Sequence, residues 1–337
     1  MIHGHGDDVY RAGQEVKANF STNVWYGSDV SFFKKLLIER ADVISHYPEP
    51  DAGSFRRAVA AYHGLRPEEV IAGNGATELF YLVAHAFAGS FTVLPVPSFT
   101  EYEDACALYD HSLRFIRKEE IGQLPDEARL MFICNPNNPD GTIWEEEEIV
   151  GLLESYPDLT VVVDESFIHF APEARSVCKY LSAYPNLLII RSMTKSYAIP
   201  GLRLGYMLGD ASLIDFIACY KQPWTVNALA IETGKYLLEQ GESLLPDARA
   251  LLCRQQSFST QIAAVPGFYP LPSRTSFFLV RTDYDAARLK QDLLERYGIL
   301  IRNASNFRGL NRHYFRINTL TEEKNRTLIE ALKIYAG

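Results

Sequence analysis

A serine, a lysine and an arginine follow a short apolar run near the middle of the chain. The run Leu187–Ile190 has the length and β-branched content of a buried strand, and Ser192 and Lys195 come directly after it. Arg203 has a glycine two residues away on each side, where the backbone can approach a ligand closely. A lysine amine can form a Schiff base with an aldehyde, while a hydroxyl and a guanidinium can hold a phosphate. This combination predicts a site for a phosphorylated aldehyde.

A serine three residues before a lysine is by itself a weak signal, because most such lysines are solvated surface residues. The longer string SMTKSYAIPGLRLGY, residues 192–206, is more specific. It resembles the class I and II aminotransferases, a family of pyridoxal-phosphate enzymes, and it is most similar to the branch that contains threonine-phosphate decarboxylases and histidinol-phosphate aminotransferases. The resemblance covers nearly the whole chain. It implies that Lys195 bonds the cofactor aldehyde and acts as general acid/base, while Ser192 and Arg203 hold the cofactor phosphate.

A glycine loop before residue 76 is a second candidate phosphate site. A strand is expected at residues 69–72, and a helix is expected over Ala76–Ala88. The unpaired N–H groups and the dipole at a helix N-terminus attract anions. The segment could be only a strand-to-helix turn, but it resembles the phosphate loop of the family. The resemblance assigns Gly75, Ala76 and Thr77 to the cofactor phosphate.

Two polar side chains follow other predicted strands, at the edge where open α/β sheets bind ligands. The strand at residues 129–134 runs into the loop Asn135–Thr142, whose prolines and glycine force a tight turn. The strand at residues 159–163 ends at Asp164, which could be only a helix cap. The resemblance implies instead that Asp164 keeps the pyridine nitrogen protonated and that Asn138 donates to the ring hydroxyl oxygen.

Three further positions are interpreted through the resemblance. Phe99 would stack on the pyridine ring, a role that suits a flat apolar face, although an aromatic there is more often part of a core. Asp140 replaces the threonine of the family's Asn-Pro-Thr-Gly pattern. Phe167 replaces a tyrosine that commonly bonds the ring oxygen in transaminases of the family. A phenylalanine at position 167 resembles the threonine-phosphate decarboxylases more than the histidinol-phosphate aminotransferases.

Two arginines stand at predicted strand ends in the C-terminal third. The planar fork of arginine can bind a carboxylate or a phosphate bidentately, although most arginines lie on protein surfaces. The resemblance assigns Arg316 to a substrate carboxylate and Arg302 to another substrate contact. It also places Asn23, in the N-terminal arm, at a substrate-facing turn. The run Arg302–Leu310 is again similar to the decarboxylases.

Tyr47 precedes a proline in a turn-rich segment, where an exposed tyrosine usually serves packing. In the family, the matching tyrosine reaches the cofactor phosphate of the neighbouring subunit. The resemblance therefore implies a homodimer with shared active sites. His3 and His5 have no carboxylate or further ligand at a useful spacing, so no metal site is expected.

The composition indicates an ordinary globular protein of 337 residues, with 47% hydrophobic and 22% charged residues. A net charge of -9 gives no basic surface for nucleic acid or an anionic membrane. The five cysteines are odd in number and lack C-x-x-C spacing, so neither a disulfide framework nor a zinc site is expected. The N-terminus lacks the regions of a signal peptide, and no apolar run has the length of a membrane span. We expect a cytoplasmic enzyme that acts on a small molecule.

The alternation of expected strands and helices predicts an α/β protein. We expect a large, doubly wound cofactor-binding domain over residues 45–240. Residues 1–44 and 241–337 should form the N-terminal arm and a small α+β domain, as in the pyridoxal-phosphate-dependent transferase fold that the resemblance implies. Ser54 is expected to cap the helix that follows the turn at residues 46–53.

The resemblance implies a reaction at the α-carbon of a small phosphorylated amino acid, most similar to that of threonine-phosphate decarboxylase in cobalamin biosynthesis. The substrate's pose decides whether carbon dioxide or a proton is lost, and no motif fixes that pose. A histidinol-phosphate-like or other amino-acid transaminase is therefore the alternative. A non-catalytic cofactor-binding regulator is a remote alternative, because the catalytic set is complete and no DNA-binding extension is present.

Overall fold

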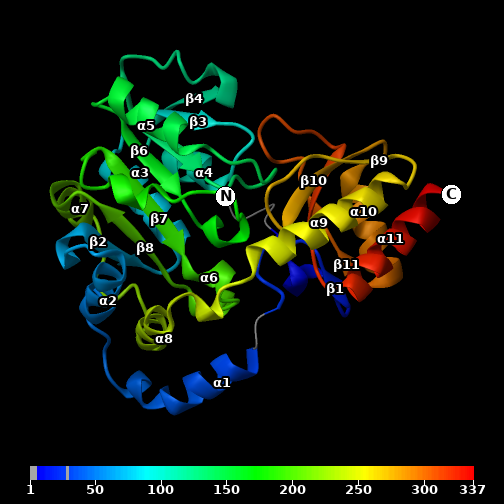
Figure 1. Cartoon of the computed structure of the whole chain (residues 1–337), viewed down its shortest axis with the longest axis horizontal. Coiled ribbons are helices and arrows are strands. Elements are labelled where there is room, and N and C mark those ends of the chain that lie inside the picture. The colour runs from blue at the N-terminus through cyan, green and yellow to red at the C-terminus, as the bar shows by residue number, and fades with distance from the viewer. Residues whose placement is uncertain (1–5, 28–29) are drawn as a thin grey trace.

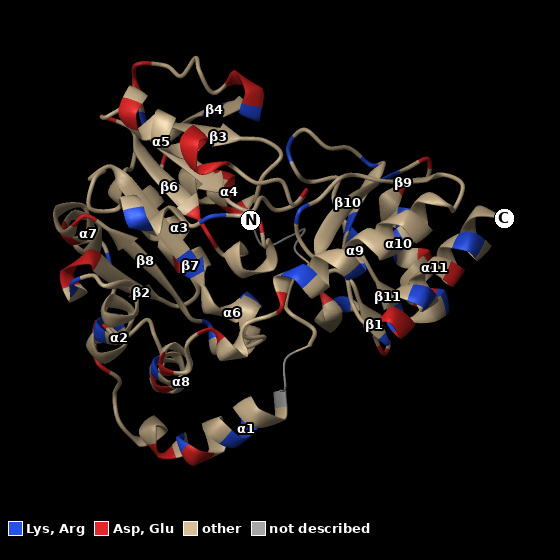
Figure 2. Ribbon diagram, in the orientation of Figure 1, with Lys and Arg blue, Asp and Glu red and all other residues tan. Residues whose placement is uncertain are grey.

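The computed structural model describes residues 6–27 and 30–337, so His3 and His5 lie outside the described residues (Figure 1). One group of elements surrounds a large sheet, and a second group contains the C-terminal elements. Most charged residues lie on helices and loops rather than on the strands of the large sheet (Figure 2). The strands are therefore suited to burial from both sides.

The large sheet is mixed and has seven strands in the order β2-β8-β7-β6-β5-β3-β4. Strands β7, β6, β5, β3 and β4 are parallel to one another, while β8 is antiparallel to both β2 and β7. The carboxyl ends of the parallel strands consequently share one edge. The strands are β2 (Val70–Gly73), β3 (Phe91–Pro95), β4 (Ser112–Ile116), β5 (Ala128–Cys134), β6 (Thr160–Asp164), β7 (Leu187–Ser192) and β8 (Gly205–Gly209).

Helices cover both faces of this sheet, as the expected doubly wound fold requires. Along β5, Leu130 and Phe132 enter one core while Met131 and Ile133 enter the other, because successive side chains of a strand point to opposite faces. One face is covered by α2 (Gly53–His63), α5 (Glu146–Ser155) and α8 (Ala228–Glu239), and the other by α3 (Ala76–Ala86), α4 (Glu101–Leu108) and α7 (Ala211–Ala218).

The C-terminal elements form a separate core around an antiparallel sheet of order β12-β13-β10-β9. A short parallel pair, β1 with β11, joins the N-terminal segment to these elements. The members are β1 (Ala18–Asn19), β9 (Phe268–Pro270), β10 (Phe277–Thr282), β11 (Ile299–Leu300), β12 (Arg302–Asn303), β13 (Tyr314–Asn318), α9 (Ala248–Ala263), α10 (Ala286–Tyr297) and α11 (Glu322–Ala336).

Helix α1 (Val30–Glu39) packs with the large sheet rather than with the C-terminal elements. Its Phe33 belongs to the core on one face of that sheet, and its Phe32 ring lies 5.7 Å from the ring of Tyr236 on α8. The domain limits at residues 45 and 240 stay a prediction.

The cap predicted at Ser54 is wrong. Helix α2 begins at Gly53, and the preceding residue, Ala52, has left-handed backbone angles. The N–H of Ser54 donates to the Glu49 carboxylate at 2.5 Å, so an acidic side chain from the turn satisfies the helix N-terminus. None of the described helices is long and apolar enough to cross a membrane.

Candidate active site

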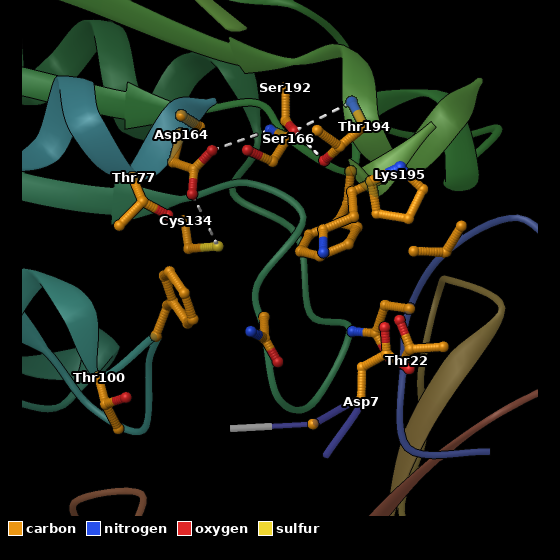
Figure 3. A pocket seen from close by; sticks show the side chains of 18 of the residues that line it. Asp7, Thr22, Thr77, Thr100, Cys134, Asp164, Ser166, Ser192, Thr194 and Lys195 are labelled. Atoms are coloured by element: carbon orange, nitrogen blue, oxygen red, sulfur yellow. Dashed lines mark hydrogen bonds between the residues drawn. The ribbon is translucent and has the colours of Figure 1, made fainter. Parts of the chain in front are cut away.

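One pocket brings together most of the side chains that the sequence singles out. It lies at the carboxyl ends of the parallel strands and is closed on the other side by the N-terminal segment and by β12 and β13. In Figure 3, Asp164, Ser192, Thr194 and Lys195 lie along one side of the view, and Asp7 and Thr22 lie along the other. The predicted residues that line the pocket are Asn23, Ala76, Thr77, Phe99, Asn138, Asp164, Ser192, Lys195, Arg203, Arg302 and Arg316.

Lys195 lies on a short helix, α6 (Met193–Ser196), which follows β7 directly. The Ser192 side chain accepts the N–H of Thr194 and so caps this helix. Burial, together with the positive charges of Arg316 and Arg203, lowers the pKa of Lys195 to about 8. A larger fraction of neutral amine is therefore present near neutral pH than for an exposed lysine, and neutral amine is the form that attacks a carbonyl.

Asp164 is the last residue of β6 and is buried. One carboxylate oxygen accepts the N–H of Ser166 at 2.9 Å, and the other accepts the hydroxyl of Tyr102 at 2.5 Å. The Cys134 thiol lies 3.9 Å from the second oxygen (Figure 3). Burial raises the pKa of Asp164, so a cation bound beside it would stabilise its charged form. Asp164 therefore fits a protonated ring nitrogen.

Tyr102 is a site residue that sequence reasoning missed. It lies on α4, three residues after Phe99, and it is fully buried. Its ring stacks on Phe132 with centroids 5.1 Å apart and meets the edges of Phe80 and Phe99 at 4.9 Å and 5.7 Å. The only signal for it in the sequence is the spacing from Phe99, which places both rings on one side of a helical turn.

Gly75 does not line the pocket but lies directly behind it. It precedes α3 with φ of +82°, and a Cβ at this position would collide with the guanidinium of Arg203. Glycine is therefore required for Arg203 to lie against the N-terminus of α3. Arg203 and the N-terminus of α3 form a cationic corner of the pocket together with Thr77 and Ser192. The Ser192 hydroxyl lies 2.7 Å from the Thr194 hydroxyl. Two hydroxyls, a guanidinium and a helix N-terminus fit a phosphate group.

Arg302 and Arg316 are directly opposite each other on the paired strands β12 and β13. Both are buried, and among the residues that the structure describes both guanidinium groups donate hydrogen bonds to neutral oxygens. Burial and the charge of Arg302 lower the pKa of Arg316 to about 9, which still leaves it cationic at neutral pH. Because like charges opposite each other on a sheet are destabilising, this arrangement suits anionic groups of a ligand.

Arg316 also orients Asn138. One Arg316 nitrogen donates to Asn138 Oδ1, and the other terminal nitrogen donates to the Ser21 carbonyl at 2.6 Å. Because a guanidinium can only donate, the amide Nδ2 of Asn138 remains to donate elsewhere. Within the described residues, Arg316 Nε and both polar side-chain atoms of Asn23 are buried without a hydrogen-bond partner. Buried polar atoms of this kind indicate a ligand site.

Tyr47 lies outside the pocket of its own chain. Its side chain is 90% exposed, and its ring lies 5.9 Å from the ring of Trp224. Any role at an active site would require a second subunit, as the sequence analysis expects.

A buried ion pair below the pocket was not predicted. Arg191 donates from Nε and Nη2 to one Glu165 oxygen, at 3.0 and 2.8 Å, and so ties the ends of β6 and β7 together. His169 lies beside it, with Nδ1 3.0 Å from the hydroxyl of Ser196, the residue after Lys195. Burial lowers the pKa of His169 to about 3, so it is neutral. In the part of the chain that the structure describes, no group of three metal-binding side chains is found.

Comparisons with known proteins identify the sequence family of the chain. A sequence family described as "Aminotransferase class I and II" matches residues 15–332. Threonine-phosphate decarboxylase of Salmonella typhimurium is 31% identical in an alignment of 331 residues that covers 94% of this chain and 90% of the relative.

Two solved structures have the same fold as this chain. L-threonine-O-3-phosphate decarboxylase from Porphyromonas gingivalis superposes with a TM-score of 0.91 and 39% identity, over 94% of this chain and 99% of that chain. Histidinol-phosphate aminotransferase from Sinorhizobium meliloti in complex with pyridoxal-5'-phosphate has a TM-score of 0.83 over 97% of this chain and 92% of that chain. At 20% identity, this second likeness shows the fold alone.

Proposed function

This chain belongs to the class I and II aminotransferases, a pyridoxal-phosphate-dependent family, and we propose that it decarboxylates threonine phosphate or a closely related small phosphorylated amino acid. The observation that carries this proposal is the pair of buried arginines, Arg302 and Arg316, in register on neighbouring strands of one pocket. A substrate with a carboxylate and a phosphate supplies an anion for each guanidinium. The likeness to two threonine-phosphate decarboxylases supports the same substrate class.

The pocket residues fit pyridoxal phosphate. Lys195 supplies the amine for the aldehyde, and Asp164 supplies a buried carboxylate for the ring nitrogen. The corner formed by Arg203, Thr77 and Ser192 at the N-terminus of α3 would hold the phosphate, and Phe99 supplies an apolar face for the ring. When bound, the cofactor supplies an electron sink conjugated to the α-carbon of the substrate.

The residues of the chain then select and complete the reaction. Arg316 would hold the substrate carboxylate, and Arg302, with Asn23, would hold the distal phosphate. Lys195, whose pKa of about 8 lies near neutrality, can donate a proton at the α-carbon after carbon dioxide has left. Asp164 would balance the positive charge of a protonated ring nitrogen bound beside it.

Asn138 could donate a hydrogen bond to the ring oxygen of the cofactor, whereas Phe167 could not. The Nδ2 of Asn138 is oriented by Arg316 and can donate to that oxygen. Phe167 has no hydroxyl and instead packs its ring 4.9 Å from that of Phe277. Asn138 without a second donor at position 167 favours a decarboxylase, as the sequence analysis expects.

We also propose a homodimer in which Tyr47 contacts the cofactor phosphate of the neighbouring subunit. Its 90% exposure in one chain supports such a contact. The five cysteines are all free, which suits a reducing compartment, and we expect the enzyme to act in the cytoplasm.

The test is an assay of the purified protein, loaded with pyridoxal phosphate, on two substrates. Threonine phosphate should release carbon dioxide, and histidinol phosphate with 2-oxoglutarate should yield no glutamate. Lys195→Ala, loaded and assayed in the same way, is the control for cofactor-dependent turnover. Glutamate formed from histidinol phosphate, without carbon dioxide from threonine phosphate, would establish the transaminase alternative.

A further inference from the structure

The loop that follows β12 meets helix α4 at the edge of the pocket. This loop, residues 304–310, is the orange segment of the C-terminal elements that lies nearest α4 in Figure 1. Its Phe307 lines the pocket together with Thr100, which precedes α4. The same two residues line a neighbouring polar hollow between α4 and the loop. The loop and α4 therefore form one border of the candidate active site.

A bidentate ion pair bridges this hollow. The Nε of Arg308 donates to Glu103 Oε2 at 3.0 Å, and its Nη2 donates to Glu103 Oε1. The guanidinium carbon of Arg308 also lies 3.8 Å from the centre of the Phe115 ring on β4. Glu103 on α4 and Phe115 on β4 belong to the group of elements around the large sheet, whereas Arg308 lies between β12 and β13 of the C-terminal sheet. Arg308 thus joins the two groups of elements through two different contacts.

The loop is attached to its own sheet independently of Arg308. Ala304 and Phe307 are buried against Leu279 of β10. The N–H of Phe307 donates to the Ala304 carbonyl at 3.1 Å, and the N–H of Leu310 donates to the Phe307 carbonyl at 3.0 Å. Loss of the ion pair should therefore make the loop more mobile against α4 and open these two hydrogen bonds more often, while the loop stays attached to β10.

The loop also orients Arg302. The Nη2 of Arg302 donates to Asn306 Oδ1 at 2.8 Å, and its guanidinium carbon lies 5.1 Å from the centre of the Phe307 ring. Asn306 and Phe307 immediately precede Arg308 in a loop with internal hydrogen bonds. A shift of Arg308 is consequently transmitted to the two side chains that fix the Arg302 guanidinium.

We propose that Glu103 and Arg308 are positioning residues for substrate: their ion pair holds loop 304–310 against α4 and so directs Arg302 toward the distal anionic group of the substrate. This proposal rests on the proposed function, because it takes that group to be a phosphate held by Arg302. An exposed ion pair has a small effect by itself, but bidentate geometry and an aromatic ring under the guanidinium both strengthen this one.

The kinetic test uses the cofactor-loaded enzyme with threonine phosphate. Arg308→Gln and Glu103→Gln should each raise KM about three- to tenfold with kcat and cofactor affinity nearly unchanged. Arg308→Lys keeps the charge but loses the bidentate fork, and it should lie between the wild type and Arg308→Gln. The swap Glu103→Arg with Arg308→Glu should recover part of the loss. Lys333→Gln, which breaks an exposed ion pair with Glu330 on α11, is the matched control and should leave KM unchanged.

A second measurement is independent of turnover. Hydrogen exchange at the amides of Phe307 and Leu310 should be faster in Arg308→Gln and Glu103→Gln than in wild type, and it should not change in Lys333→Gln. If threonine phosphate is not a substrate, the exchange data still report whether the ion pair holds the loop, so the two proposals fail separately. Unchanged exchange in both variants, or an unchanged KM for threonine phosphate in an active enzyme, would overturn the positioning role.

Discussion

The hydroxyl of Tyr102 donates to a carboxylate oxygen of Asp164 at 2.5 Å, and both residues are buried. Burial raises the pKa of Asp164, while the hydrogen bonds from Tyr102 and Ser166 oppose that shift. Burial also raises the pKa of Tyr102 well above its ordinary value, so its hydroxyl remains protonated and donates throughout the working pH range. Tyr102 therefore helps Asp164 to stay charged in an apolar part of the pocket.

Tyr102→Phe should keep the aromatic packing but remove this donor. We expect the cofactor-free protein to lose about 1.5–3 kcal/mol of unfolding free energy at neutral pH, the usual effect of a hydrogen bond to a charged group. Cofactor affinity should fall as well, because the ring nitrogen would face a less fully charged Asp164. Denaturant unfolding and cofactor titration measure the two effects. Tyr81→Phe removes a similar donor, to Glu101 outside the pocket, and is the control for the cofactor effect.

The pH dependence of this loss follows from the sign of the Asp164 shift. The folded protein binds more protons than the unfolded one between the ordinary pKa of 3.8 and the raised folded pKa, so the contribution of Asp164 to stability falls as pH rises through that window. Tyr102→Phe raises the folded pKa further. The stability difference from wild type should therefore shrink in acid and grow toward neutral pH, and a difference that is constant with pH would contradict this account.

The strand ends of the large sheet could be predicted because each carries a local pattern. The apolar run before Ser192 and the β-branched run before Asp164 both indicate buried parallel strands, and such strands end at a common edge. Lys195, Asp164 and Asn138 therefore meet in one pocket as expected. Their chemical roles, however, are inferred from the resemblance to a family. The match of the family over residues 15–332 supports that resemblance.

The contacts that support these side chains could not be predicted in the same way. Tyr102 and Asp164 are far apart in the sequence, and nothing local to either residue specifies the other. The ion pair between Arg308 and Glu103 also joins distant segments, and it depends on how the two groups of elements pack. The error at Ser54 has a local cause, since the helix already begins at Gly53 and the Glu49 carboxylate accepts the N–H of Ser54 itself.

Lys195→Met should stabilise the cofactor-free protein near neutral pH. The folded pKa of about 8 lies below the ordinary 10.5, so the buried lysine must be charged at an energetic cost below pH 8. The shift corresponds to about 3 kcal/mol at 1.36 kcal/mol per pKa unit. Stability of the wild type should rise relative to the variant between pH 8 and 10.5, because the unfolded state binds more protons there. Parallel denaturant curves from pH 7 to 10 measure this difference, which must narrow with rising pH if the amine is buried.

Lys195 also provides a spectroscopic prediction. The purified protein with pyridoxal phosphate should absorb in the near-visible as a lysine-bound cofactor, and Lys195→Ala should lose that covalent attachment. Borohydride reduction followed by peptide mass analysis identifies the modified lysine. Attachment at a different lysine would refute the assignment of the site.

Tyr47 should act in the active site of the neighbouring subunit. Mixing a Tyr47→Ala subunit with a Lys195→Ala subunit places both changes in one site of the heterodimer and leaves its other site intact. Each heterodimer would have one intact site of two, so its activity should approach half that of a wild-type dimer, although both parent homodimers are impaired. Heterodimers verified by differential tags that regain no activity would show that Tyr47 serves its own chain. Tyr10→Ala, another exposed tyrosine, is the control.

Arg316→Gln should separate carboxylate substrates from the others. Truncating one partner of a buried charge pair commonly costs about 3 kcal/mol, so kcat/KM for threonine phosphate and serine phosphate should fall more than a hundredfold. Histidinol phosphate, which has no carboxylate, should be affected less.

The same change removes a positive charge that lowers the pKa of Lys195, and that pKa should consequently rise from about 8. A panel of threonine phosphate, serine phosphate, histidinol phosphate, aspartate and leucine, assayed with wild type, Arg316→Gln and Arg316→Lys across pH, measures both effects. An unchanged kcat/KM for carboxylate substrates in Arg316→Gln would exclude Arg316 as the carboxylate site. Leucine as the best wild-type substrate would contradict a distal anionic group at Arg302, because an unpaired guanidinium in a closed pocket would retain its desolvation cost.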